Sequence, residues 1–122
     1  MTSTSLRKFK MTKEDITEKF LYYATEHGHA IWQGNHQEAN KMHEELQKLY
    51  KVAKEKNVPD IFSSFLTEED ANVRLWAATF TLKINPGIAE QELMNLSELK
   101  GITAISARTL LKLWRQGLLD LL

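Results

Sequence analysis

With 122 residues, the chain is long enough to fold as one domain, and its lack of cysteine excludes disulfides and thiolate metal sites. Acidic and basic residues balance to a formal net charge of zero, which argues against a general nucleic-acid binder. No apolar run approaches the roughly 20 residues of a membrane span, and the polar, basic start is not typical of a secretory signal. We therefore expect a cytoplasmic protein without a membrane anchor.

The first 57 residues predict a basic tail followed by two long antiparallel helices. The tail covers residues 1–11 and could be flexible. The first helix is expected to start at Thr12 and to stop at Gly34, and Asn35 with Glu38 three residues later predicts a capped second helix to about Asn57. The apolar stripe of the first helix is expected to comprise Ile16, Phe20, Tyr23, Ala24, His27 and Ile31. That of the second comprises Ala39, Met42, Leu46, Leu49, Tyr50 and Ala53.

Residues 61–82, IFSSFLTEEDANVRLWAATFTL, predict a second helical hairpin with an acidic turn. A short helix should run from Pro59 to Leu66 and a longer one from about Asp70 to Ile84. Val73, Ala77 and Phe80 recur at helical spacing, so the longer helix is expected to have one apolar face. Trp76, Phe62 and Phe65 are assigned to the core.

The remaining residues predict two more helices and an apolar tail. Residues 85–87, Asn-Pro-Gly, break the chain before a fifth helix at about 88–96, and a sixth is expected at about 103–116. The Leu-rich tail at 117–122 should either dock on the last helices or be buried against another chain. No segment alternates with a period of two, so we predict an all-α fold. It should contain about six helices in antiparallel hairpins, forming one HEAT-like short solenoid or bundle over residues 12–122.

Charge is unevenly distributed along the chain. Residues 58–98 carry seven acidic and two basic side chains, whereas residues 1–13 and 99–122 are both net basic. Glu68, Glu69 and Asp70 give the middle segment an acidic turn that could meet a basic partner. The alternative is a solvated turn in which Asp70 or Asn72 caps the following helix.

Three motifs carry a resemblance to a known family. They are the long N-terminal hairpin, VRLWAATFTL after an acidic turn, and the Asn-Pro break followed by AEQELMNLS; the closing segment AISARTLLKLWRQGLL also fits. From about Glu14 to Leu118 the chain resembles the small bacterial HEAT-like family called domain of unknown function twenty-nineteen. The resemblance implies an all-α right-handed stack of helices and no established enzyme activity. Some proteins of this kind lie beside polymorphic toxins, which implies an immunity role.

The histidines are the only side chains that suggest a metal. His27 and His29 precede the turn at Gly34 and His36 and His43 follow it, so the hairpin could bring His27 opposite His43. Imidazoles with a carboxylate would suit zinc, but the chain has no histidine pair four residues apart. The alternative is that His27 lies on the inner stripe and the others are solvated. We expect no metal ligand, cofactor or catalytic residue, and a histidine metal site is kept as a minor alternative.

These observations favour a non-catalytic protein-binding domain. The expected partner is a protein, most concretely a basic toxin domain that an immunity or antitoxin-like protein would cover and block. The residues assigned to partner binding are Trp32, Glu68, Glu69, Asp70 and Asn72. Exposed Trp and Tyr are favoured interface anchors, although Trp32 could instead fold over its turn. The alternative function is a scaffold or adaptor, with homodimerisation through the C-terminal Leu-rich segment.

Overall fold

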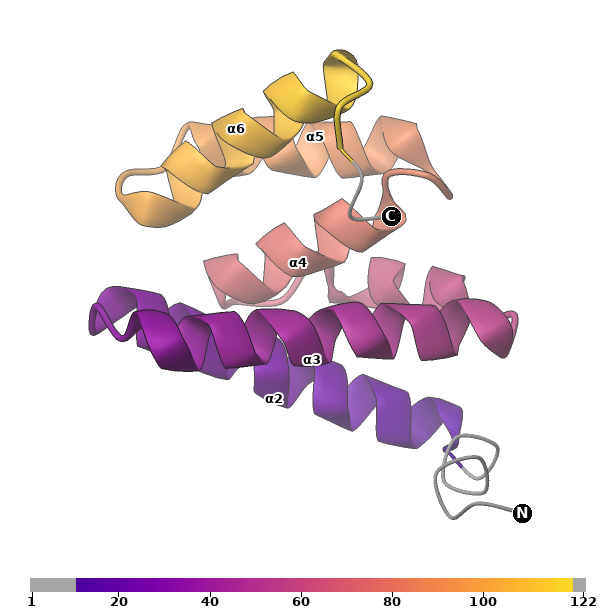
Figure 1. Cartoon of the computed structure of the whole chain (residues 1–122). Coiled ribbons are helices and arrows are strands. Elements are labelled where there is room, and N and C mark those ends of the chain that lie inside the picture. Colours follow the sequence, from indigo (N-terminus) through magenta and orange to yellow (C-terminus); the bar gives the residue numbers. More distant parts are fainter. Residues whose placement is uncertain (1–10, 120–122) are drawn as a thin grey trace. The chain divides into compact units, whose positions relative to one another are not determined.

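The computed structural model describes residues 11–119, whose regular structure is entirely helical (Figure 1). These residues form five α-helices and one 3-10 helix and contain no strand, which confirms the predicted all-α fold of about six helices. By its internal contacts the chain divides into two compact units, an N-terminal unit of Met1–Ile61 and a C-terminal unit of Phe62–Leu122. The prediction of one domain over residues 12–122 stays a prediction, and that of a basic tail lies outside the described residues except for Met11.

The N-terminal unit is a hairpin of two helices, α2 (Lys13–Trp32) and α3 (His36–Glu55), which lie side by side and antiparallel (Figure 1). Thr12 caps α2 as predicted: its hydroxyl accepts from the Asp15 N–H at 3.1 Å, and its own N–H donates to the Asp15 carboxylate at 2.9 Å. The two hydrogen bonds from Thr12 lower the pKa of Asp15 below its ordinary value. The start of α2 is therefore fixed by a reciprocal capping box.

The turn between α2 and α3 also follows the sequence pattern. The backbone of Gly34 has a φ of 72°, in the left-handed region that glycine adopts without steric cost. The next residue, Asn35, accepts a hydrogen bond from the Glu38 N–H at 3.1 Å and so caps α3. This short connection makes the two helices antiparallel neighbours.

The buried stripes of the hairpin agree with prediction on α3 and differ in part on α2. All six residues predicted for α3 are buried. On α2, Ile16, Phe20 and Ala24 are buried, whereas Tyr23, His27 and Ile31 are half-buried and Ala30 is buried instead. Ala30 and Ile31 lie at opposite edges of the stripe, where a small side chain is covered completely and a longer one reaches solvent.

The C-terminal unit holds most of the 3-10 helix η1 (Pro59–Phe65), then α4 (Ala71–Thr81), α5 (Pro86–Ser97) and α6 (Ile102–Arg115). The α5 and α6 helices lie side by side, and α4 contacts both (Figure 1). The chain breaks between α4 and α5 as predicted, and α5 starts at Pro86, two residues before the expected start at about residue 88. The short helix that we predicted from Pro59 to Leu66 is present as η1, which is a tighter 3-10 helix.

The predicted extension of α4 to Ile84 is wrong, because the helix ends at Thr81. The hydroxyls of Thr79 and Thr81 donate to the carbonyls of Leu75 and Ala77 at 2.7 Å each, so both buried hydroxyls are satisfied within the helix. Such back-bonding by a β-branched residue bends a helix and weakens its continuation. The chain then turns, with the Ile84 N–H donating to the Thr81 carbonyl.

The core of the C-terminal unit surrounds α4. One cluster joins α4, α5 and α6 through Leu75, Ala78, Leu82, Ala89, Leu93, Leu96, Ala107 and Leu111. Phe80 is fully buried, with its ring centroid 5.0 Å from that of Phe62 and 5.6 Å from that of Trp76. The expected apolar face of Val73, Ala77 and Phe80 is buried, and burial extends beyond it, because eight of the eleven residues of α4 are buried. The assignment of Trp76, Phe62 and Phe65 to the core is confirmed.

The two described leucines of the Leu-rich tail differ in burial. Leu119 packs against the core cluster of the C-terminal unit, whereas Leu118 is 63% exposed. Residues 120–122 of the predicted dimerisation segment lie outside the described residues. Among the helices at residues 11–119, none has the length and apolar character needed to cross a bilayer.

Candidate functional site

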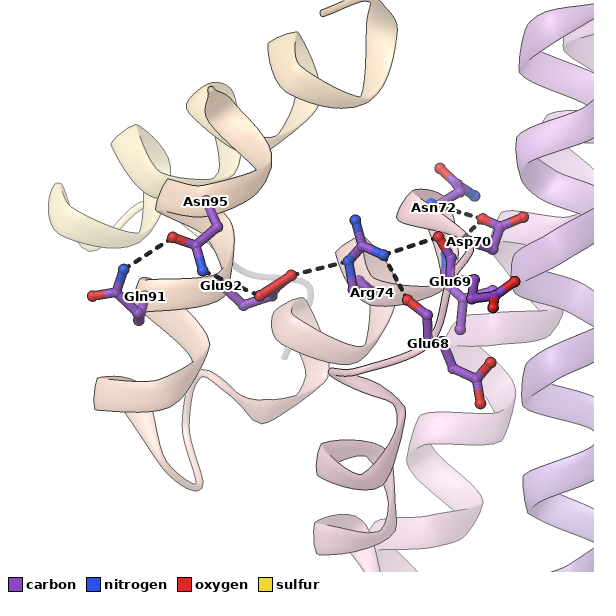
Figure 2. Close-up of polar contacts among 9 residues, drawn as sticks. Glu68, Glu69, Asp70, Asn72, Arg74, Gln91, Glu92 and Asn95 are labelled. Carbon is purple, nitrogen blue, oxygen red and sulfur yellow. Dashed lines mark hydrogen bonds and ion pairs between the residues drawn. The ribbon is translucent and has the colours of Figure 1, made fainter. Parts of the chain in front are cut away.

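The acidic turn before α4 contains one structural carboxylate and two outward ones. The Asp70 carboxylate accepts from the Asn72 N–H at 2.8 Å and from the Val73 N–H at 3.1 Å (Figure 2). Asp70 is therefore the N-cap of α4, in agreement with the solvated-turn alternative, and Asn72 contributes its backbone N–H to that cap. Glu69 is exposed and Glu68 half-buried, and Figure 2 shows both side chains pointing away from Arg74.

Arg74 fixes the backbone of this turn from the first turn of α4. Its Nη1 donates to the main-chain carbonyls of Glu68 at 2.6 Å and Glu69 at 2.9 Å. Its Nε donates to the Glu92 carboxylate on α5 at 3.0 Å, and the two side chains are only 21% and 17% exposed (Figure 2). A planar guanidinium suits this role because its donors diverge in fixed directions. Arg74 thus connects the acidic turn to α5.

A chain of amides extends this network along α5. The Asn95 side-chain amide donates to Glu92 at 3.5 Å, and Gln91 donates to the Asn95 carbonyl oxygen at 3.0 Å (Figure 2). These contacts connect two exposed amides of α5 to the Glu92 carboxylate, which accepts from Arg74. The carboxylates of Glu68 and Glu69 are carried by a backbone whose carbonyls accept hydrogen bonds from Arg74.

The N-terminal unit presents a separate apolar surface on α2. Trp32, at the last position of α2, is 86% exposed, so it does not fold over the turn. Leu21 lies eleven residues earlier, on the same side of the helix, and is 40% exposed; Tyr22 beside it is 59% exposed. We call Leu21, Tyr22 and Trp32 the α2 outer face.

The residues assigned to partner binding from the sequence fall into two groups. Glu68, Glu69, Asp70 and Asn72 lie together in one turn of the C-terminal unit, whereas Trp32 belongs to the N-terminal unit. The two groups therefore belong to different units of the chain. Two of the turn residues, Asp70 and Asn72, already act in the cap of α4.

The sequence reasoning missed Arg74 and Glu92 as the residues that order the turn. The two are 18 residues apart, on different helices, so no local spacing pairs them. The only available signal was the arginine directly after Val73 in a helix that is otherwise uncharged, because such a cation needs an acceptor.

The histidines do not assemble a metal centre in the part of the chain that the structure describes. No group of three or more His, Asp or Glu side chains is placed to hold an ion among residues 11–119. His27 and His43 are both half-buried, and His29 lies 3.6 Å from the Glu26 carboxylate. Burial lowers the pKa of His43 below its ordinary value, an effect that the nearby Glu44 partly opposes.

Comparisons of the chain with protein-family models, curated proteins and solved structures gave no match. The resemblance to the HEAT-like family therefore stays a prediction from the sequence motifs.

Proposed function

We propose that this chain is a non-catalytic protein-binding domain of the immunity or antitoxin type, which covers and blocks a basic toxin domain. The observation that carries the proposal is the exposure of Trp32, of which 86% is accessible to solvent at the end of a capped, paired helix. A tryptophan on an already formed helix loses little backbone entropy on binding, and its burial removes a large apolar area from water. The immunity role itself rests on the family resemblance.

The acidic turn supports a basic partner. Glu68 and Glu69 point away from Arg74, and their backbone carbonyls are held by it (Figure 2). A fixed charge attracts a basic surface at long range and mainly raises the association rate. The two surfaces therefore have different expected roles, with anchoring by the α2 outer face and electrostatic attraction by the turn.

The test of anchoring is Trp32→Ala, measured with a partner isolated by pull-down from the native cell and then purified. We expect the affinity to fall by at least about 30-fold, as for a hot-spot residue, with an unchanged melting temperature. The matched control is Gln33→Ala, which truncates the neighbouring exposed side chain and should leave the affinity unchanged. Co-expression should also show that the wild-type chain suppresses the partner's toxicity. A Trp32→Ala protein with wild-type affinity would contradict the anchoring role.

The test of the acidic turn is the double substitution Glu68→Lys and Glu69→Lys, with Asp70 retained because its loss would remove a cap worth about 1 kcal/mol. We expect roughly tenfold slower association at low salt, and a difference that shrinks as salt screens the charges. The control is Glu14→Lys with Glu44→Lys, an equal charge change on exposed positions of α2 and α3. Equal association rates for the two double variants would show that the turn does not attract the partner.

The exposure of Leu118 favours a second candidate, a homodimeric scaffold. In that case the partner is a second copy, and Leu118→Lys should convert a dimer into a monomer in light scattering. A monomer at high concentration of the wild-type protein would exclude this candidate.

A further inference from the structure

A groove between α5 and α6 is lined by cations on one wall and contains apolar side chains. Its volume is about 630 Å³. The α6 wall contributes Arg108, Lys112 and Arg115, and Met94 on α5 and Leu111 on α6 supply the apolar surface. Among the described residues, the lining holds three cations and one acidic residue, Glu98, so this part of the groove has an excess of positive charge.

Two of the three cations are held at the ends of the groove. The Arg108 Nη2 donates to the Ser97 carbonyl at the end of α5, at 2.8 Å. The Arg115 Nε lies 3.4 Å from the Glu90 carboxylate, in a pair whose side chains are 55% and 32% exposed. Such an exposed ion pair contributes little to the free energy of folding. A carboxylate from a partner can therefore replace Glu90 with little loss of stability.

Lys112 lies between the two arginines in sequence and has no ion-pair partner among residues 11–119. It is exposed. The groove therefore has a central cation that is available to an anionic group, between two arginines that keep further N–H donors.

We propose that the α5–α6 groove binds an extended acidic segment of a partner protein in which carboxylate and apolar side chains alternate. Arg108 and Lys112 are separated by about 6 Å along the helix axis, at about 1.5 Å per residue. Alternate residues of an extended segment are about 6.6–6.8 Å apart and point to the same side. Two carboxylates on one side of the segment would then face the α6 wall.

The other side of such a segment would face α5. There Met94 is 43% exposed and provides an adaptable apolar contact for the side chain between the two carboxylates. The alternation of the segment thus matches the cations of α6 on one side and the apolar contact of Met94 on the other.

The lining favours a peptide over a nucleic acid. Among the described residues, no aromatic side chain lines the groove, so they provide no platform on which a base could stack. The cations from Arg108 to Arg115 cover only about 10 Å of α6, a short stretch for following a phosphate backbone.

This site is independent of the proposed function, because it uses cations of α6 and not the α2 outer face or the acidic turn. The experiment uses the full chain and a fluorescein-labelled peptide with the alternating core Glu-Leu-Glu-Leu-Glu, followed by fluorescence anisotropy. The comparison probes are the same peptide with glutamine for glutamate and a single-stranded oligonucleotide of equal charge.

We expect the acidic peptide to bind and Lys112→Glu to weaken it at least tenfold, whereas Lys83→Glu, an equal charge change at an exposed position outside the groove, has no effect. Met94→Glu should weaken binding from the α5 side, and melting temperatures would show that all variants remain folded. The proposal is overturned by an absence of peptide binding, by equal affinities of the Lys112→Glu and Lys83→Glu proteins, by equal binding of the glutamine peptide, or by tighter binding of the oligonucleotide.

Discussion

The two units of this chain bury their helices in different ways. The α3 helix of the N-terminal unit buries six of its twenty residues in one stripe, whereas α4 of the C-terminal unit buries eight of its eleven. A helix with one buried stripe keeps a surface that can bind a partner, while a helix buried on most sides holds its neighbours in place. The difference indicates that α2 and α3 can tolerate surface changes and that α4 cannot.

The largest expected effect is that of Phe80→Ala in α4. Phe80 is fully buried between the rings of Phe62 and Trp76, so its removal leaves a cavity and should lower the free energy of unfolding by about 3–5 kcal/mol. Tyr22→Ala on the exposed side of α2 removes a similar ring and should cost less than about 1 kcal/mol. Denaturant unfolding of both variants measures the difference in stability loss. Equal losses would show that side chains on α2 and α4 contribute equally to the free energy of unfolding.

A smaller effect is expected when Arg74 is replaced by methionine. The change leaves Glu92 and the carbonyls of Glu68 and Glu69 without their donor, and we expect a loss of about 1–3 kcal/mol in the free energy of unfolding. Arg115→Met breaks the exposed pair with Glu90 and should cost less than about 1 kcal/mol. If thermal unfolding shows the same loss of stability for the Arg74→Met and Arg115→Met proteins, the hydrogen bonds of Arg74 stabilise the fold no more than an exposed ion pair does.

The smallest effect is a dependence of stability on pH that resides in the N-terminal unit, which holds all four histidines. Burial lowers the folded-state pKa of His43 below its ordinary value of 6.5, so folding favours the neutral ring. The resulting stability is present above about pH 6.5 and is lost as the pH falls toward and through the folded pKa. Between about pH 7.5 and 5.5, the melting temperature of His43→Gln should therefore fall less than that of the wild-type protein.

The exposed His36 provides the control for this titration. His36→Gln removes one exposed imidazole and tests whether the loss of any histidine changes the melting temperature in the same way. An identical fall in melting temperature for the wild-type and His43→Gln proteins would assign the effect to other groups.

The elements of this fold were predictable where the signals are local. Thr12, Gly34 and Asn35 act within a few residues of themselves, and the stripe of α3 follows from a single helical period. The burial of α4 was not predictable in the same way, because the apolar residues Leu75 and Ala78 lie outside the stripe formed by Val73, Ala77 and Phe80. Which sides of a helix are covered depends on contacts with distant segments.

The candidate site was predictable only in part for a related reason. The position of the acidic turn and the presence of Trp32 can be read from the sequence, but the exposure of Trp32 depends on what packs around it. The sequence does not show that the side chains of Glu68 and Glu69 point outward, because this depends on Arg74 and on Glu92, which lies on another helix. A pair 18 residues apart leaves no periodic pattern.

The order of the two units along the chain bears on folding during synthesis. The α2–α3 hairpin packs two helices on either side of one short turn, so the contacts between α2 and α3 are complete within the first 55 residues. The core cluster of the C-terminal unit, in contrast, joins Leu75 to Leu111 and needs α6 to complete it. During translation the hairpin can therefore close while α4 still lacks its neighbours, and the apolar α4 is the segment that a chaperone would meet exposed on the ribosome.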